Sequence, residues 1–206
     1  MRYPKLISKT GYKKFILQSP KIINQINQII ETSLPQDIEK ISTKRFRQII
    51  LDIQNIVNEK KFHHLIVFEN SCFFDRLFES NEYSITSVVH IRGVRPASKE
   101  PLEFLNFHRE NFYSDGDYID HQINIQIPIR NYTARSSMFY IPNSHQISDS
   151  DLVIEKKDST FSKVEKFSVG HKIGLSYNPK FIMSGVDVTK AKRVNLIANQ
   201  GIAFTS

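Results

Sequence analysis

The feature that most limits the fold of this chain is a change in the spacing of its apolar residues near residue 62. Before this point, apolar residues recur every three or four positions over residues 22–30 and again over 46–57. This spacing predicts two amphipathic helices, the first with Ser19 as N-cap and Pro20 as its first residue. From residue 63 on, short β-branched and aromatic segments alternate with turn residues, which is typical of an antiparallel sandwich or barrel.

The strands expected in this second part are short and numerous. They are predicted at residues 65–68, 84–94, 119–129, 137–141, 160–169, 172–177, 180–186 and 192–199. Residues 73–78 are expected to form a turn of helix, 148–158 a loop, and 1–18 an irregular arm with a short strand near 14–17. The pattern predicts one mostly β domain over residues 1–206, with a mainly helical layer at 1–62 and a β core at 63–206.

Composition indicates an ordinary globular protein, with 40% hydrophobic and 24% charged residues. The sequence has no apolar run near the roughly 20 residues that span a bilayer, and its first residues lack a signal-peptide pattern. We therefore expect a cytoplasmic protein with no membrane partner. The single cysteine, Cys72, fits a reducing compartment and is expected to be a buried, inert thiol.

The net charge of +7 raises the question of a nucleic-acid partner. Lysine and arginine are spread along the chain in blocks no longer than a pair, and aromatic residues do not alternate with them. A nucleic-acid partner is therefore not expected, whereas the positive charge would help to recruit an anionic small molecule. The sequence also contains no Gly-x-Ser-x-Gly elbow, no Gly-rich phosphate loop and no Cys/His zinc spacing.

The most distinctive chemistry lies in the segment Phe107-His108-Arg109-Glu110. His108 and Glu110 are two residues apart, so their side chains leave the same face of an extended backbone. An imidazole and a carboxylate side by side are two of the three ligands of the 2-His-1-carboxylate triad that holds non-haem iron(II). The segment is therefore a candidate metal site.

The order of motifs around this segment makes residues 84–200 resemble the iron(II)/2-oxoglutarate-dependent dioxygenase superfamily, especially its phytanoyl-CoA-dioxygenase-like branch. The motifs are Arg95-Pro96, Phe107-His108-Arg109-Glu110, the strand at 122–129, Ile141-Pro142-Asn143-Ser144-His145, the segment 181–188 and Arg193-Val194. The resemblance implies a double-stranded β-helix (a jelly roll, cupin-like) covered by a layer of about two helices.

The same resemblance implies an enzyme that uses iron(II) and 2-oxoglutarate to oxidise a small polar metabolite or a carrier-linked intermediate. It makes His108 and Glu110 metal ligands and catalytic residues. It makes Arg193 the residue that binds the distal carboxylate of 2-oxoglutarate, because a guanidinium pairs with a carboxylate in a bidentate way. Neither the substrate nor the oligomeric state follows from the sequence.

One position departs from the family pattern, since Met183 stands where the second histidine ligand is expected. A thioether is a poor iron(II) ligand among oxygen and nitrogen donors, and Met183 is expected to be a core residue. Three alternatives stay open. The iron site is weakened or lost; another histidine completes the triad; or the resemblance is to the fold alone, and the chain is a jelly-roll module that binds a ligand or partner without iron. The histidines considered as substitutes are, in order, His145, His121 and His171. The histidines expected to be structural or surface residues are His63, His64 and His90.

Overall fold

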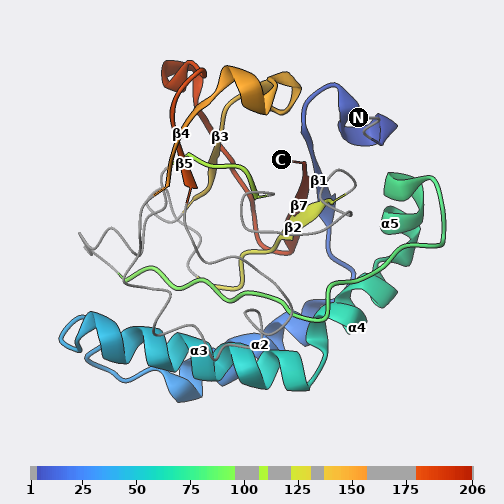
Figure 1. Ribbon diagram of the computed structural model, residues 1–206. Helices are drawn as coiled ribbons and strands as arrows, with labels where there is room; N and C mark the ends of the chain where they lie inside the picture. The colour runs from blue at the N-terminus through green and yellow to red at the C-terminus, as the bar shows by residue number, and fades with distance from the viewer. Residues whose placement is uncertain (1–3, 96–106, 111–121, 131–136, 157–179, 206) are drawn as a thin grey trace.

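The computed structural model describes residues 4–95, 107–110, 122–130, 137–156 and 180–205 (Figure 1). Within these ranges all five α-helices precede residue 80, and all but one of the strands follow residue 120. The helices are α1 (Lys5–Ser8), α2 (Pro20–Ser33), α3 (Thr43–Glu59), α4 (Phe62–Glu69) and α5 (Ser71–Phe78). The strands are β1 (Tyr12–Ile16), β2 (Asn124–Gln126), β3 (Phe139–Tyr140), β4 (Val153–Lys156), β5 (Lys180–Ser184), β6 (Lys192–Arg193) and β7 (Gln200–Phe204).

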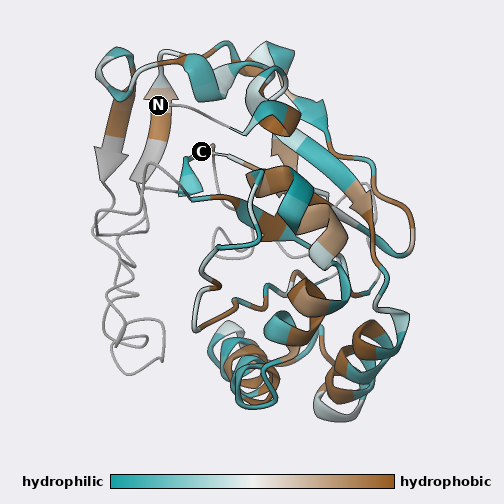
Figure 2. Ribbon diagram, turned by 90° about the vertical axis from the view of Figure 1, so that its right-hand side faces the viewer, coloured by the Kyte–Doolittle hydropathy of each residue, from teal (hydrophilic) through white to brown (hydrophobic). Residues whose placement is uncertain are grey.

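The two long helices confirm the prediction made from apolar spacing. α2 begins with Pro20 at its first position, and α3 begins after Ser42, whose side-chain oxygen accepts a hydrogen bond from the Arg45 amide at 3.2 Å. Figure 2 shows both helices nearly end-on, with hydrophobic and hydrophilic residues on different sides of each. The buried residues of these helices include Ile22, Ile23, Ile26, Phe46, Ile49, Ile53 and Val57.

Helix extends further along the chain than predicted. Residues 65–68, predicted to be a strand, belong to α4, while the helical turn expected at 73–78 is confirmed as part of α5. Asn70 lies at the junction of these two helices and is buried. Its Nδ2 donates to the Ile66 carbonyl at 2.7 Å and to Ser19 Oγ at 2.9 Å, and its Oδ1 accepts from the Gln18 amide at 2.9 Å. These bonds join the α4–α5 junction to the start of α2.

The strands form three small sheets. In the first, β7 lies between β1 and β2, and both pairings are antiparallel. The other two sheets are the antiparallel pairs β3 with β6 and β4 with β5. The predicted mostly β, double-stranded β-helix is therefore wrong: the described ranges are mixed in helix and strand and show no jelly roll. β-branched and aromatic residues indicate surfaces that pack against another element, but they do not specify that element. In this protein, helices supply much of the packing that was assigned to strands.

The remaining strand predictions are confirmed in part. The confirmed strands lie within longer predicted ranges: β2 in 119–129, β3 in 137–141, β5 in 180–186 and β6 in 192–199. β4 occupies part of the predicted loop at 148–158, and β7 was not predicted. The strands predicted at 160–169 and 172–177 lie outside the described residues.

Residues 84–95, predicted as a strand, form an extended segment that lies on α3 rather than in a sheet (Figure 1, green chain above α3). Asn58 of α3 accepts from the Val89 amide at 2.8 Å and donates to the Val89 carbonyl at 3.0 Å. Gln54 accepts from the Ile91 amide at 3.0 Å. Amide side chains of a helix therefore satisfy backbone groups that a neighbouring strand would otherwise bind.

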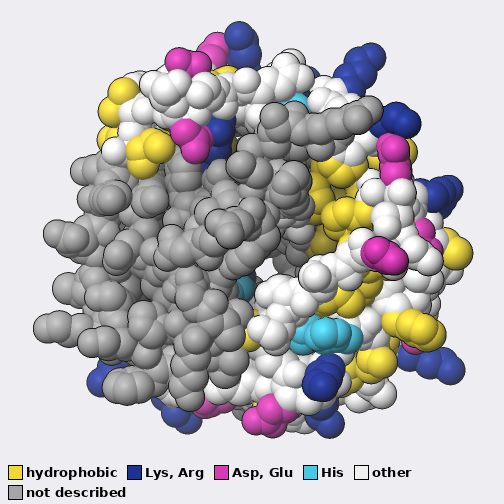
Figure 3. Space-filling model, turned by 45° about the vertical axis from the view of Figure 1, so that its right-hand side comes forward, with side chains coloured by type: hydrophobic (Ala, Val, Ile, Leu, Met, Phe, Trp, Pro, Cys, Tyr) yellow, Lys and Arg dark blue, Asp and Glu magenta, His cyan; other side chains and the backbone are white. Residues whose placement is uncertain are grey.

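The described surface shows Lys and Arg side chains spread around one face of the molecule rather than gathered in a patch (Figure 3). Cys72 is exposed, so the prediction of a buried thiol is wrong. Its position in α5 explains this, because the buried residues of that helix are Phe74 and Leu77. Among the described helices, none combines the length and the apolar character that crossing a membrane requires.

Candidate functional site

His108 and Glu110 lie together in the structure, as their two-residue spacing predicts. Nε2 of His108 is 3.4 Å from Oε1 of Glu110. The His108 side chain is 15% exposed and that of Glu110 38% exposed, so both are reached by solvent while being largely surrounded by protein. The pair is thus accessible to a small ligand or ion.

Arg109, between the two, is buried and anchors the segment. Its guanidinium pairs with Asp149 and donates to the carbonyl oxygens of Ser144, at 2.9 Å, and of Ile147. The segment is not a strand, since Glu110 lies in a 3₁₀ turn, and the contacts of Arg109 fix the position of the backbone that carries His108 and Glu110. No local sequence pattern indicates this role, because the partners of Arg109 lie 35 to 40 residues further along the chain.

Strand β5 runs next to this segment, since the Ile182 amide donates to the Phe107 carbonyl at 2.8 Å. β5 also carries Met183, which stands where the resemblance expects the second histidine ligand. Met183 directly follows Ile182, the residue that is hydrogen-bonded to Phe107. Met183 is 59% exposed, and the prediction that it is a core residue is wrong.

His145 lies in the short 3₁₀ helix Ser144–Gln146 and packs against the N-terminal part of the chain. Its Nε2 is 3.1 Å from the carbonyl oxygen of Ser8, and because a carbonyl only accepts, this nitrogen carries the proton. The turn at Gly11, with φ of +79°, covers the ring so closely that a Cβ there would lie 2.7 Å from His145 Nδ1. This environment makes His145 a packing residue. The other proposed substitutes, His121 and His171, lie outside the described residues.

Arg193 is exposed on β6, opposite Phe139 of β3. Its Nε donates to Asn195 Oδ1 at 2.8 Å, and Lys14 of β1 contacts the backbone oxygen of Asn195. The terminal nitrogens of a guanidinium form a second donor edge that suits a carboxylate. Carboxylate binding by Arg193 stays a prediction.

His90 lies in the extended segment 84–95 and is expected from the sequence to be a structural or surface residue. Desolvation by the surrounding protein lowers the pKa of the His90 imidazole, and the Glu110 carboxylate acts on it in the opposite direction. His90 and Glu110 are therefore within electrostatic range of each other.

The geometry of the pair fits two ligands of one small divalent ion. With metal–ligand distances of about 2.1 Å, donors separated like His108 Nε2 and Glu110 Oε1 subtend an angle of about 108° at the ion, close to common coordination angles. In the part of the chain that the structure describes, no three His, Cys, Asp or Glu side chains lie close enough together to hold a metal ion. The described residues thus bring together two side chains of metal-binding chemistry, without a third close to them.

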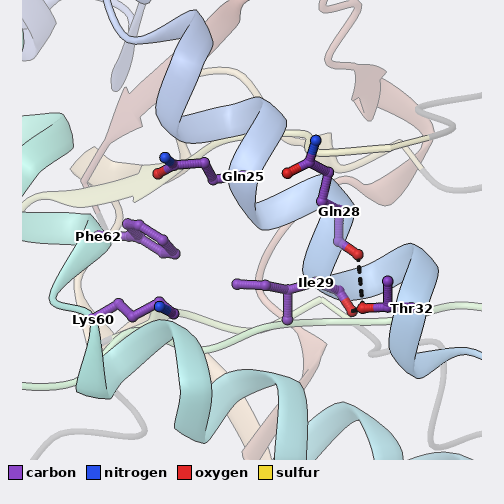
Figure 4. A pocket seen from close by; sticks show the side chains of 6 residues that line it. All are labelled: Gln25, Gln28, Ile29, Thr32, Lys60 and Phe62. Carbon is purple, nitrogen blue, oxygen red and sulfur yellow. Dashed lines mark hydrogen bonds between the residues drawn. The ribbon is translucent and has the colours of Figure 1, made fainter.

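A separate hollow of about 480 Å³ lies between α2 and the start of α4 (Figure 4). It is lined by Gln25, Gln28, Ile29, Thr32, Lys60 and Phe62. The Thr32 hydroxyl lies within hydrogen-bonding distance of the carbonyl oxygens of Gln28, at 2.9 Å, and of Ile29, at 3.1 Å, inside its own helix. Since the lining offers one cation and no carboxylate or imidazole, the chemistry of the His108–Glu110 pair makes that pair the better candidate site.

No family model matches the chain. Neither a curated protein nor a solved structure matches it.

Proposed function

We propose that this protein is an iron(II)- and 2-oxoglutarate-dependent oxygenase that hydroxylates or otherwise oxidises a small polar metabolite or a carrier-linked intermediate. The observation that carries the proposal is the 3.4 Å approach of His108 Nε2 to Glu110 Oε1. An imidazole and a carboxylate held together suit the iron(II) of such oxygenases. The choice of 2-oxoglutarate as co-substrate comes from the sequence resemblance of residues 84–200.

In this proposal the bound iron supplies the oxidative chemistry that protein side chains lack. His108 binds through the lone pair of Nε2, which requires a neutral imidazole with its proton on Nδ1. Glu110 contributes a carboxylate oxygen and a negative charge. Arg109 acts only as a positioning residue, because its guanidinium faces away from the pair and is bound to Asp149, Ser144 and Ile147.

Arg193 binds the distal carboxylate of 2-oxoglutarate in this proposal, through the bidentate pairing that guanidinium groups favour. The net charge of +7 increases the local concentration of such an anionic co-substrate. A cytoplasmic location and a small-molecule substrate, with neither a membrane nor a nucleic acid as partner, are part of the same proposal.

The exposure of Met183 favours a second candidate function. If the third ligand position is occupied by this thioether, iron is bound weakly or not at all. The chain then acts as a binding module, in which His108, Glu110 and Arg193 recognise a polar ligand through hydrogen bonds and charge. The two candidates share residues and differ in whether a metal is required.

The first experiment is an anaerobic titration of the protein with iron(II), with and without 2-oxoglutarate, followed by the visible metal-to-ligand charge-transfer band. The proposal expects a saturable band in the wild type that is lost in His108→Ala and in Glu110→Ala. Glu59→Ala, which removes an exposed carboxylate at the end of α3, is the matched control and should keep the band. A wild-type protein with no iron affinity would refute the oxygenase, and calorimetry with 2-oxoglutarate alone would then test the second candidate.

A further inference from the structure

We infer that the hollow between α2 and the start of α4 binds a small organic carboxylate with an apolar body. None of the described residues that line it belongs to the His108–Glu110 pair, so the inference goes beyond the proposed function and does not depend on it. The volume of the hollow, about 480 Å³, lies within the range of pockets that hold small molecules. Its walls, its floor and its charge determine which kind of ligand fits.

One wall of the hollow is a single face of α2. Gln28, Ile29 and Thr32 follow Gln25 by three, four and seven positions, so these side chains are neighbours along one side of the helix. The Thr32 hydroxyl is bonded to carbonyl oxygens of its own helix. The two glutamine side chains are exposed, and each amide carries two N–H groups. The glutamines are therefore the donors that this wall offers to a ligand.

The opposite wall is the turn between α3 and α4. Lys60 and Phe62 flank Lys61, whose φ of +52° is left-handed and uncommon for a residue that has a side chain. This conformation is held from both sides, because the Lys61 amide donates to the Asn58 carbonyl and the Lys61 carbonyl accepts from the His64 amide, both at 3.0 Å. Figure 4 shows the consequence, since Lys60 and Phe62 both point toward α2.

The floor of the hollow is apolar. Phe62 is a buried member of the hydrophobic core, and Ile29 packs against that core from α2. In Figure 4 the Ile29 side chain points from α2 toward Phe62. A ligand with an apolar body would cover these two side chains and remove apolar surface from water, which favours binding.

Among the described residues that line the hollow, Lys60 carries the only charge. Glu31, next to Thr32 in the chain, is paired with Arg130 at 3.1 Å. The positive end of the α4 dipole adds to the charge of Lys60, because Phe62 is the first residue of α4 and the first turn of this helix has no acidic residue. One ammonium beside neutral amides matches the single negative charge of a carboxylate, which accepts hydrogen bonds from both kinds of group.

The test titrates the full chain with hydrocinnamate, with its neutral amide and with inorganic phosphate, followed in proton–nitrogen correlation spectra. With hydrocinnamate we expect saturable shifts of the signals of residues 25–32 and 60–62. The neutral amide should bind about 3- to 5-fold more weakly, as the loss of one solvent-exposed ion pair predicts. Phosphate, which has no apolar body, should give no saturable shift.

Three variants assign the binding to the hollow. Lys60→Met should bind hydrocinnamate and its neutral amide with equal affinity, because the charge that distinguishes them is gone. Gln28→Trp should abolish binding by filling the hollow with an indole. Lys44→Met, which removes an exposed lysine at the opposite end of α3, is the control and should bind as the wild type does. All three replace exposed side chains, and the same spectra establish that each variant is folded.

Four results would overturn the inference. The first is a wild type in which hydrocinnamate shifts no signal of residues 25–32 or 60–62. The second is a Lys60→Met variant that still prefers hydrocinnamate to its amide, and the third is unchanged binding in Gln28→Trp. The fourth is phosphate binding as tight as that of hydrocinnamate, which would show that the apolar floor plays no part.

Discussion

Replacing Arg109 by methionine tests whether this residue holds the candidate site in place. The substitution removes the donor to two backbone carbonyls, those of Ser144 and Ile147, and the ion pair with Asp149. The Ser144 carbonyl keeps the Ile147 amide as a donor at 3.1 Å, so the substitution leaves only the Ile147 carbonyl without this partner. A buried acceptor left without a partner costs about 1–3 kcal/mol, and the partly exposed position of Ile147 favours the lower end. Asp149 is 53% exposed, so its pair with Arg109 adds under about 1 kcal/mol. The expected total is about 1–3 kcal/mol.

This loss of stability is measured by urea denaturation, and for a chain of this length it corresponds to a decrease of about 2–12 °C in Tm. Arg109→Lys is the informative comparison, because an ammonium keeps the charge but cannot donate to all three acceptors in the same geometry. In both folded variants, iron(II) affinity should fall because His108 and Glu110 are no longer directed to one face. Unchanged stability together with unchanged affinity in Arg109→Met would contradict the positioning role.

Two further predictions concern the helical layer. Desolvation and then the neighbouring His64 lower the pKa of buried His63 below its ordinary value of 6.5, with the Thr86 backbone opposing the shift. As the pH falls, the His63 imidazole of the unfolded chain takes up a proton before that of the folded chain, so stability present above about pH 6.5 is lost below it. Urea denaturation at pH 7.5 and 5.5 should show this loss, and His63→Phe should abolish it. A wild-type stability that does not change with pH would contradict the assignment. Asn70→Leu removes three hydrogen bonds at the α4–α5 junction and should lower the free energy of unfolding by about 2–4 kcal/mol. A Tm equal to that of the wild type would show that these bonds make no net contribution to stability.

The long helices were predictable because their signals are local. Apolar spacing and the residues at the helix starts act within a few positions of one another. The segment at 65–68 was misassigned because α4 is apolar on several sides, so that neither a helical nor a strand period is visible. Its helical state depends instead on packing and on the bonds of Asn70 to Ser19 and Gln18, about 50 residues away.

The predicted β core failed for a related reason. A run of alternating β-branched residues indicates an extended chain with one apolar face, but it does not specify what the chain pairs with. At residues 84–95 the extended backbone is present, while Asn58 and Gln54 of α3 take the place of a neighbouring strand. Counting such segments as strands of one closed sheet therefore overestimated the β content.

The candidate site was predictable only at its centre. The two-residue spacing of His108 and Glu110 predicts their closeness, although Glu110 lies in a 3₁₀ turn and not in a strand. The groups that anchor the segment of this pair act over long sequence separations, since Asp149, Ser144 and Ile147 hold Arg109. All three lie in one later part of the chain, beside the 3₁₀ helix Ser144–Gln146, so no local pattern around residue 109 identifies them as its partners. The pair itself is therefore visible in the sequence, whereas the contacts that hold it in place are visible only in the structure.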